Sequence, residues 1–179
     1  MDGAGPVTAY SAITVTPYSP NVGAVIGNID LTRPLAETEL AELRRAFIEY
    51  SVLFFRDQDI GHDDHARLAE YFGAIGQHVG KKTNSQESDD PRIRKFHADG
   101  ETPRVSGNVW HTDQSCAPLP PLASILYLHT VPPHGGGDTG FANMYAAYEA
   151  LSDRMKAYLE GLTAKHEGAI QFGEGTPDA

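Results

Sequence analysis

The sequence contains a single cysteine, Cys116, and therefore cannot form a disulfide within the chain. This scarcity is typical of proteins from a reducing compartment, so we expect a cytoplasmic protein. The first residues carry neither the basic region nor the apolar core of a secretory signal, and we expect none. The densest apolar run, VLFF at residues 52–55, is much shorter than the roughly 20 residues that cross a membrane. We therefore expect no association with membranes.

Basic residues are also scarce. The chain has 14 Lys and Arg against 24 Asp and Glu, which gives a formal net charge of −10. Because a surface that follows nucleic-acid phosphates needs clustered positive charge, we expect no nucleic-acid partner. Of the 179 residues, 40% are hydrophobic and 21% are charged, as is typical of a globular protein. This length suits one domain, and we predict a single domain over residues 1–179.

The hydrophobic patterns of the first half predict a mixed α/β fold. Residues 13–30 combine β-branched residues with proline and glycine, which favours short strands and turns. In residues 35–50 the apolar side chains recur at helical spacing, which predicts a helix. The stretch SVLFF at 51–55 is typical of a short buried strand, and a second helix is predicted over about 62–72.

The second half begins with a polar segment, residues 76–107, that is too long for a routine connection. Long irregular segments in compact domains often serve as lids, so we predict an active-site lid here. Strands are predicted at about 108–113, at 123–131 and near 139–143. Two short helices are expected in the stretch that follows, which contains YAAYEALSDRMKAYLEGL.

One residue separates two side chains that can bind metal, His111 and Asp113, in the stretch NVWHTDQSC. In a strand, residues i and i+2 point to the same face, so a histidine nitrogen and a carboxylate oxygen could converge on one ion. Such a pair is two-thirds of the 2-His-1-carboxylate arrangement that holds Fe(II) and leaves positions open for substrates. The same pattern also describes a surface histidine beside a capping aspartate, so both interpretations stay open at this point.

Longer stretches of the chain carry a family resemblance. WHTDQS, the proline-rich stretch after it and GGGDT resemble the Fe(II)- and 2-oxoglutarate-dependent dioxygenases related to taurine dioxygenase. Further runs match in the same order and cover nearly the whole chain: VGAVIGNIDLTRPL, SVLFFRDQDI, LAEYFGAIGQH and MYAAYEALSDRMKAYLEGLTAKHEG. The resemblance implies a double-stranded β-helix (jelly-roll) core, mainly β, with flanking helices.

The same resemblance implies roles for individual residues. His111 and Asp113 would be catalytic residues that bind the iron, and Thr139 would hydrogen-bond the distal carboxylate of 2-oxoglutarate. His78 takes the place of a histidine that contacts the sulfonate of the substrate in taurine-using relatives. Cys116 stands where many relatives carry a phenylalanine that lines the substrate pocket, which is a departure from a taurine-shaped pocket.

The implied activity is oxidation by dioxygen, with Fe(II) as cofactor and 2-oxoglutarate as a cosubstrate that yields succinate and carbon dioxide. The implied substrate is a small anionic molecule: a sulfonate such as taurine, an alkyl sulfate or an aryloxy acid. A homo-oligomer is also expected. Two alternatives stay open. One is a non-catalytic pseudoenzyme or ligand-binding module of the same fold, and the other is a cupin-like protein that uses another divalent ion.

Two groups that the resemblance implies have no counterpart in the sequence. In the family, a second histidine ligand and an arginine that binds 2-oxoglutarate lie much later in the chain than the H-x-D pair. Since the sequence ends at Ala179, we expect both groups to lie outside it and the jelly roll to be incomplete. We therefore expect the sequence to be part of a longer protein, rather than to be completed by a second polypeptide or to be an inactive truncation.

Overall fold

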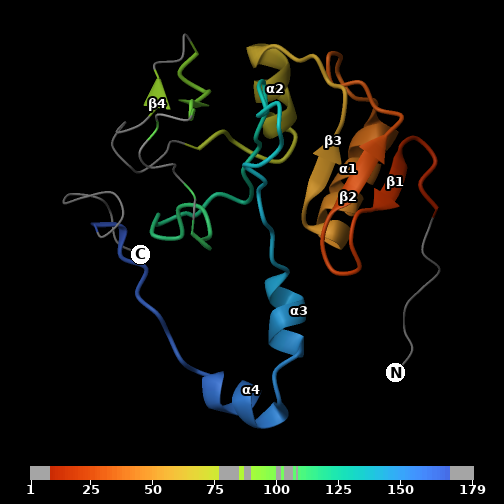
Figure 1. Ribbon diagram of the computed structural model, residues 1–179. Coiled ribbons are helices and arrows are strands. Elements are labelled where there is room, and N and C mark those ends of the chain that lie inside the picture. The colour runs from red at the N-terminus through yellow and green to blue at the C-terminus, as the bar shows by residue number, and fades with distance from the viewer. Residues whose placement is uncertain are drawn as a thin grey trace. The chain divides into compact units, whose positions relative to one another are not determined.

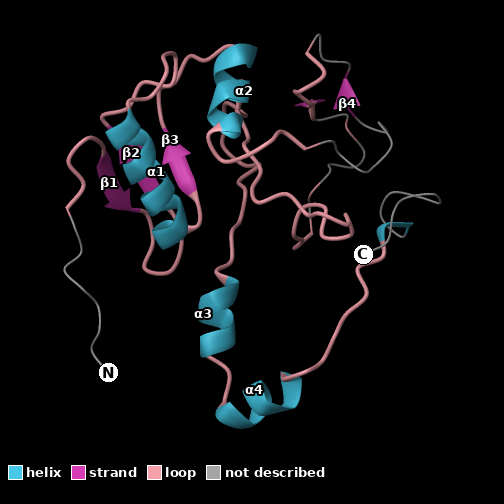
Figure 2. Ribbon diagram, turned by 180° about the vertical axis from the view of Figure 1, so that it is seen from behind, coloured by secondary structure: helices cyan, strands magenta, loops and turns pink. Residues whose placement is uncertain are grey.

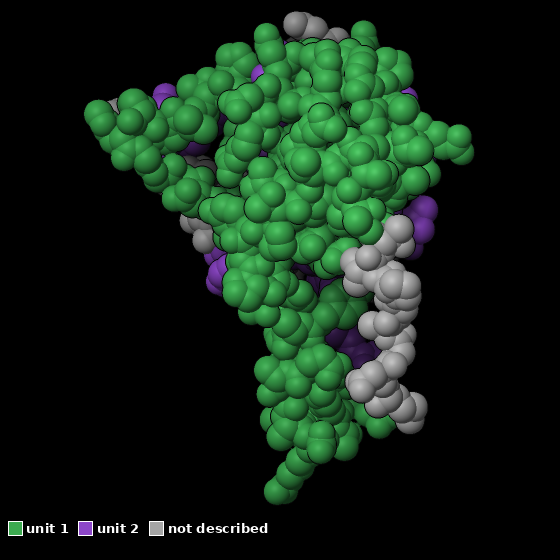
Figure 3. All heavy atoms as spheres, turned by 90° about the vertical axis from the view of Figure 1, so that its right-hand side faces the viewer, with its two compact units in different colours: residues 1–64, 128–160 green, residues 65–127, 161–179 purple. Residues whose placement is uncertain are grey.

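The computed structural model describes residues 9–76, 85–86, 90–99, 102, 107 and 109–169. It divides the chain into two compact units, neither of which is continuous in sequence. Unit 1 comprises residues 1–64 and 128–160, and unit 2 comprises residues 65–127 and 161–179 (Figure 3). The prediction of one domain over the whole chain stays a prediction.

Unit 1 contains a three-stranded sheet with a helix across one face, which is seen from both sides in Figures 1 and 2. Strand β1 (Thr14–Pro17) runs antiparallel to β2 (Ala24–Gly27), and β2 runs parallel to β3 (Leu53–Phe55). Parallel neighbours need a crossover connection, which helix α1 (Glu37–Tyr50) supplies. These elements confirm the mixed α/β prediction for the first half of the chain.

The core of unit 1 follows from the two periodicities of its elements. On β2, Ala24 and Ile26 are two residues apart, share one face of the strand and are 0% and 3% exposed. On α1, Leu43 and Ala46 are three residues apart, share one face of the helix and are both 0% exposed. Ile48 lies elsewhere on the helix surface and is 83% exposed. The buried face of α1 is therefore set by helical spacing.

A buried carboxylate closes the start of α1. Glu39 is only 8% exposed and accepts two hydrogen bonds from the Arg33 guanidinium, at 2.6 and 2.9 Å. It also accepts the backbone N–H of Ala36 at 2.7 Å, one of the donors that a helix start leaves without an intrahelical partner. The guanidinium of Arg33, followed by this N–H, lowers the pKa of Glu39 to about 2.

A second carboxylate of α1 holds the segment before β1. Glu42 accepts the backbone N–H groups of Ser11, Ala12 and Ile13 at 2.7, 2.9 and 3.1 Å. The hydrogen bond from the Ser11 N–H is the main reason why the pKa of Glu42 is lowered to about 2. Ile13, at the end of this segment, is 2% exposed and belongs to the core. The charge of Glu42 therefore positions the entry into the sheet.

The later part of unit 1 carries α3 (Met144–Glu149) and α4 (Asp153–Leu159), close to the two helices predicted there. Asn143 caps α3 by accepting the N–H of Ala146 at 3.0 Å. The other end of the same amide donates to the carbonyl oxygen of Asn21 at 2.6 Å. One side chain thus starts a helix and ties it to the turn between β1 and β2.

Unit 2 takes up most of α2 (His62–Glu70), whose bounds agree with the predicted helix. Its inward residues Ala66 and Leu68 are 1% and 4% exposed. A two-stranded sheet of β4 (Ser85–Gln86) and β5 (Lys95–Phe96) follows. Most of the predicted lid lies outside the described residues, so its function stays a prediction. In the described part of the chain, no helix is both long and apolar enough to cross a membrane.

The structure differs from the sequence prediction in three segments of the second half. Strands were expected at 108–113, 123–131 and 139–143, and the described residues of these segments carry none. A strand exists only where its N–H and C=O groups pair with a neighbouring strand, and no such partner lies among the described residues. The composition of these segments suits a sheet but does not supply the partner. The described residues therefore do not show the jelly roll, which stays a prediction.

Candidate metal centre

His111 and Asp113 face each other in unit 2. Nε2 of His111 lies 3.2 Å from Oδ1 of Asp113, and the two side chains are 49% and 50% exposed. The chain turns directly afterwards, with Gln114 at φ 49° and the N–H of Ala117 donating to the Gln114 carbonyl at 2.9 Å. The two side chains thus lie together although the segment forms no strand.

A backbone carbonyl fixes which nitrogen of His111 is available. Nδ1 lies 2.7 Å from the carbonyl oxygen of Val109, and a carbonyl can only accept. Nδ1 must therefore carry a hydrogen, and in the neutral form of the ring the lone pair is at Nε2. Histidine ligands of metal ions are typically oriented by such a hydrogen bond from the ring nitrogen that does not bind the metal.

A serine fixes the other member of the pair. The hydroxyl of Ser124 donates to Oδ2 of Asp113 over a short distance, 2.5 Å. A hydrogen bond to a charged acceptor is shorter and stronger than one between neutral groups. Oδ1 is the oxygen that remains turned towards His111. No motif predicts this contact, because nothing distinguishes the serine in PPLAS from other loop serines.

The facing atoms fit two positions of a metal ion. With Nδ1 protonated, the neutral histidine presents a lone pair to a carboxylate oxygen, and two acceptors at 3.2 Å repel each other unless a cation lies between them. That cation is either a proton or a metal ion. Ligand atoms about 2.1 Å from a metal and at right angles to each other are roughly 3.0 Å apart, close to the observed distance. Within the described ranges, no cluster of three or more His, Cys, Asp or Glu residues completes such a site.

The other predicted site residues are less constrained by the structure. Thr139 is exposed and belongs to unit 1, so its contact with a cosubstrate stays a prediction. His78 lies outside the described residues. Cys116 is 5% exposed and buried in unit 2, and its place in a substrate pocket stays a prediction. The structure therefore brings together His111 and Asp113 and adds Ser124 to them.

The family model for "Taurine catabolism dioxygenase TauD, TfdA family" matches residues 14–179. The chain belongs to this family. The predicted resemblance is thereby confirmed. The TauD/TfdA match includes the candidate metal pair and the helices α1, α2, α3 and α4.

Individual relatives agree with this assignment to the TauD/TfdA family. The alpha-ketoglutarate-dependent 2,4-dichlorophenoxyacetate dioxygenase of Cupriavidus pinatubonensis is 31% identical, in an alignment of length 168 that covers 87% of this chain and 58% of the relative. A solved taurine dioxygenase from Burkholderia xenovorans is 34% identical with a TM-score of 0.69, over 88% of this chain and 54% of that one. The solved complex of AAD-2 with Mn(II) and N-oxalylglycine is 28% identical with a TM-score of 0.64, over 92% and 57%.

The matched part of these proteins is limited. The chain spans about half the length of the curated relatives it matches. Family membership is therefore a property of this chain, whereas the activity belongs to the whole protein.

Proposed function

We propose that the whole protein is a dioxygenase that uses Fe(II) and 2-oxoglutarate to hydroxylate a small anionic substrate. The observation that carries the proposal is the pair of ligand atoms, His111 Nε2 and Asp113 Oδ1, 3.2 Å apart in a chain of the TauD/TfdA family. The solved complex of the relative AAD-2 with Mn(II) supports a divalent metal ion in this protein.

The residues of this chain prepare the site in distinct ways. When bound, Fe(II) with 2-oxoglutarate and dioxygen supplies oxidation of a substrate C–H bond to an alcohol, with release of succinate and carbon dioxide. In its neutral form His111 would offer the lone pair of Nε2, because Nδ1 carries the hydrogen that is donated to the Val109 carbonyl. Asp113 offers one negative charge, which offsets part of the charge of a divalent ion. The side chains of Val109 and Trp110 are 67% and 76% exposed and offer apolar surface for the carbon skeleton of a substrate.

The substrate class rests on the relatives. One of them is named for 2,4-dichlorophenoxyacetate and another for taurine, and both molecules carry an anionic group. We therefore propose a sulfonate, an alkyl sulfate or an aryloxy acid as substrate, with His78 and Cys116 as contact residues. Thr139 is proposed to hydrogen-bond 2-oxoglutarate. A jelly-roll core that encloses these groups is part of the same proposal.

The test measures succinate formed from 2-oxoglutarate by the full-length protein, with and without Fe(II), in the presence of each substrate class. We expect succinate only when Fe(II) is present, and we expect His111→Ala and Asp113→Ala each to abolish it together with iron binding. The matched control is His129→Ala, which removes another exposed histidine whose Nδ1 contacts the Thr130 hydroxyl at 3.0 Å. This control should keep activity.

Three results would contradict the proposal. One is a folded full-length protein that binds iron but forms no succinate with any of these substrates, which would favour a non-catalytic member of the family. Unchanged iron affinity in both alanine variants would show that His111 and Asp113 are not the iron ligands. Equal activity with an iron-free protein that carries another divalent ion would favour a different metal.

A further inference from the structure

We propose that Ser124 is a positioning residue that fixes the Asp113 carboxylate, so that a metal ion is bound by Oδ1 alone rather than by both oxygens. This inference rests on the proposed function, because it assigns a role to the chain around the metal pair. It is supported by a different observation from the one behind the proposed function, namely the hydrogen bond from the Ser124 hydroxyl to Oδ2 of Asp113 at 2.5 Å.

The two oxygens of Asp113 have different surroundings. Oδ2 accepts the one hydrogen that a serine hydroxyl has, and Oδ1 faces Nε2 of His111 at 3.2 Å. Binding through both oxygens would require Oδ2 to turn towards the metal and to give up this charge-assisted hydrogen bond. Since the Asp113 side chain is 50% exposed, packing alone does not fix the plane of its carboxylate. The hydroxyl of Ser124 does.

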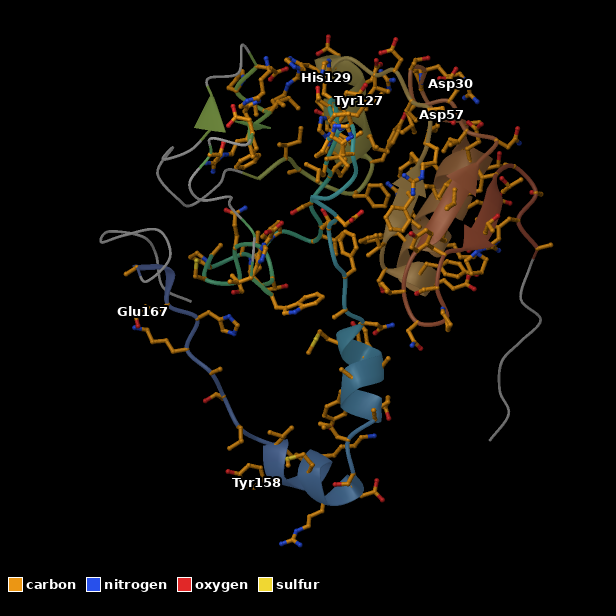
Figure 4. The ribbon with its side chains drawn as sticks, in the orientation of Figure 1. Asp30, Asp57, Tyr127, His129, Tyr158 and Glu167 are labelled. Atoms are coloured by element: carbon orange, nitrogen blue, oxygen red, sulfur yellow. The ribbon has the colours of Figure 1, made fainter. Side chains whose placement is uncertain are left out.

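The segment that carries Ser124 is itself anchored to a helix. Nε2 of His65, on α2, lies 3.2 Å from the carbonyl oxygen of Ile125, to which it can only donate. The ring of His65 also meets the ring of Tyr127 edge-on, with centroids 6.4 Å apart (Tyr127 is labelled in Figure 4).

These contacts form one connected path within unit 2. It runs from α2 through His65 to the backbone of Ile125, from there to the neighbouring Ser124, and from its hydroxyl to Asp113. The path explains how a residue in a segment without a strand can be held accurately enough to orient a ligand. Groups in the second layer around a metal typically change its affinity 10- to 100-fold when they are removed.

The experiment titrates the full-length protein with Mn(II) and follows free Mn(II) by electron paramagnetic resonance. Four variants are compared with the wild type: Ser124→Ala, Ser124→Thr, Ser152→Ala and His111→Ala. Ser124 is exposed, so removal of its hydroxyl leaves no cavity in the core. Ser124→Thr keeps a hydroxyl. Ser152 caps α4 in unit 1 by accepting the N–H of Met155. Ser152→Ala therefore also removes one hydrogen-bonded serine hydroxyl, but in the other unit.

We expect Ser124→Ala to weaken Mn(II) binding about 10- to 100-fold, Ser124→Thr to restore it to within a few-fold, and Ser152→Ala to leave it unchanged. Wild-type affinity in Ser124→Ala, with binding lost in His111→Ala, would overturn this inference and leave the proposed function standing. Equal losses in the threonine and alanine variants would also overturn it, because the hydroxyl would then not be the cause. Wild-type affinity in His111→Ala would instead overturn the proposed function.

Discussion

Glu39→Gln is expected to destabilise the chain at neutral pH and to change the pH dependence of its stability. Glutamine keeps the shape of the side chain but loses the charge that accepts hydrogen bonds from Arg33 and from the N–H of Ala36. The NH₂ group of the new glutamine would also point at an N–H donor of Arg33 or Ala36, where two donors cannot form a hydrogen bond. The change therefore leaves donors at the start of α1 without a partner in a place that is 8% exposed.

The size of the effect follows from the pKa of Glu39. The folded chain lowers this pKa from 4.5 to about 2, mainly through the Arg33 guanidinium. Each unit of pKa corresponds to about 1.4 kcal/mol, which sets a ceiling of about 3 kcal/mol. The side chain of Arg33 is 47% exposed, so solvent screens the interaction, and we expect about 1 to 2 kcal/mol.

The pH range follows from the sign of the shift. Because the pKa is lower in the folded chain, the unfolded chain binds more protons between pH 4.5 and about 2. The contribution of Glu39 is therefore complete above pH 4.5 and is lost as the pH falls towards 2. Glu42 titrates in the same range, but it does so in both proteins and cancels in the difference between wild type and variant.

The assay is urea unfolding followed by far-ultraviolet circular dichroism at several pH values from 7 to 3. The matched control, Glu37→Gln, removes a charge from an exposed side chain in the same helical turn and should change stability by less than about 0.5 kcal/mol. A difference between wild type and Glu39→Gln that is the same at pH 7 and pH 3 would refute the reasoning. So would a loss at pH 7 no larger than that of the control.

Two further predictions concern unit 1. Leu43→Ala, at a fully buried position of α1, should lower the free energy of unfolding by about 2 to 5 kcal/mol. Ile48→Ala, on the exposed side of the same helix, should change it by less than about 0.5 kcal/mol. Equal losses of stability in thermal unfolding would contradict the assigned core. Gly23→Ala should destabilise by about 1 to 3 kcal/mol, because φ is +90° and the new Cβ would lie 2.9 Å from the Phe54 ring. Gly61→Ala, where the new Cβ meets only ordinary contacts, should be nearly neutral in the same measurement.

The helices were predictable because their signals are local. Apolar spacing over 35–50 and 62–72 identified α1 and α2, and each helix makes its backbone hydrogen bonds within its own segment. The short strand β3 was also predicted, from the apolar run VLFF at 52–55. The three later strands were predicted from similar composition and are absent from the described residues. Composition signals a preference for a sheet, but only another segment can supply its hydrogen bonds.

The candidate site divides in the same way. The spacing of His111 and Asp113 placed both side chains on one side of the chain, and the structure shows them 3.2 Å apart. Ser124, eleven positions later, could not be linked to Asp113 from the sequence, because a proline-rich loop of unknown path separates them. The contact of His65 with the Ile125 carbonyl likewise depends on how α2 meets a distant segment of the chain.

The sequence by itself determined the family, the helices and the convergence of the candidate metal pair, since each rests on motifs or on spacing within a few residues. The tertiary structure decided which nitrogen of His111 donates to the Val109 carbonyl, which oxygen of Asp113 is held, and what holds it. Those features depend on the direction of individual hydrogen bonds. Such directions are set only when the chain has folded and a carbonyl, a hydroxyl and a helix have been brought to the same place.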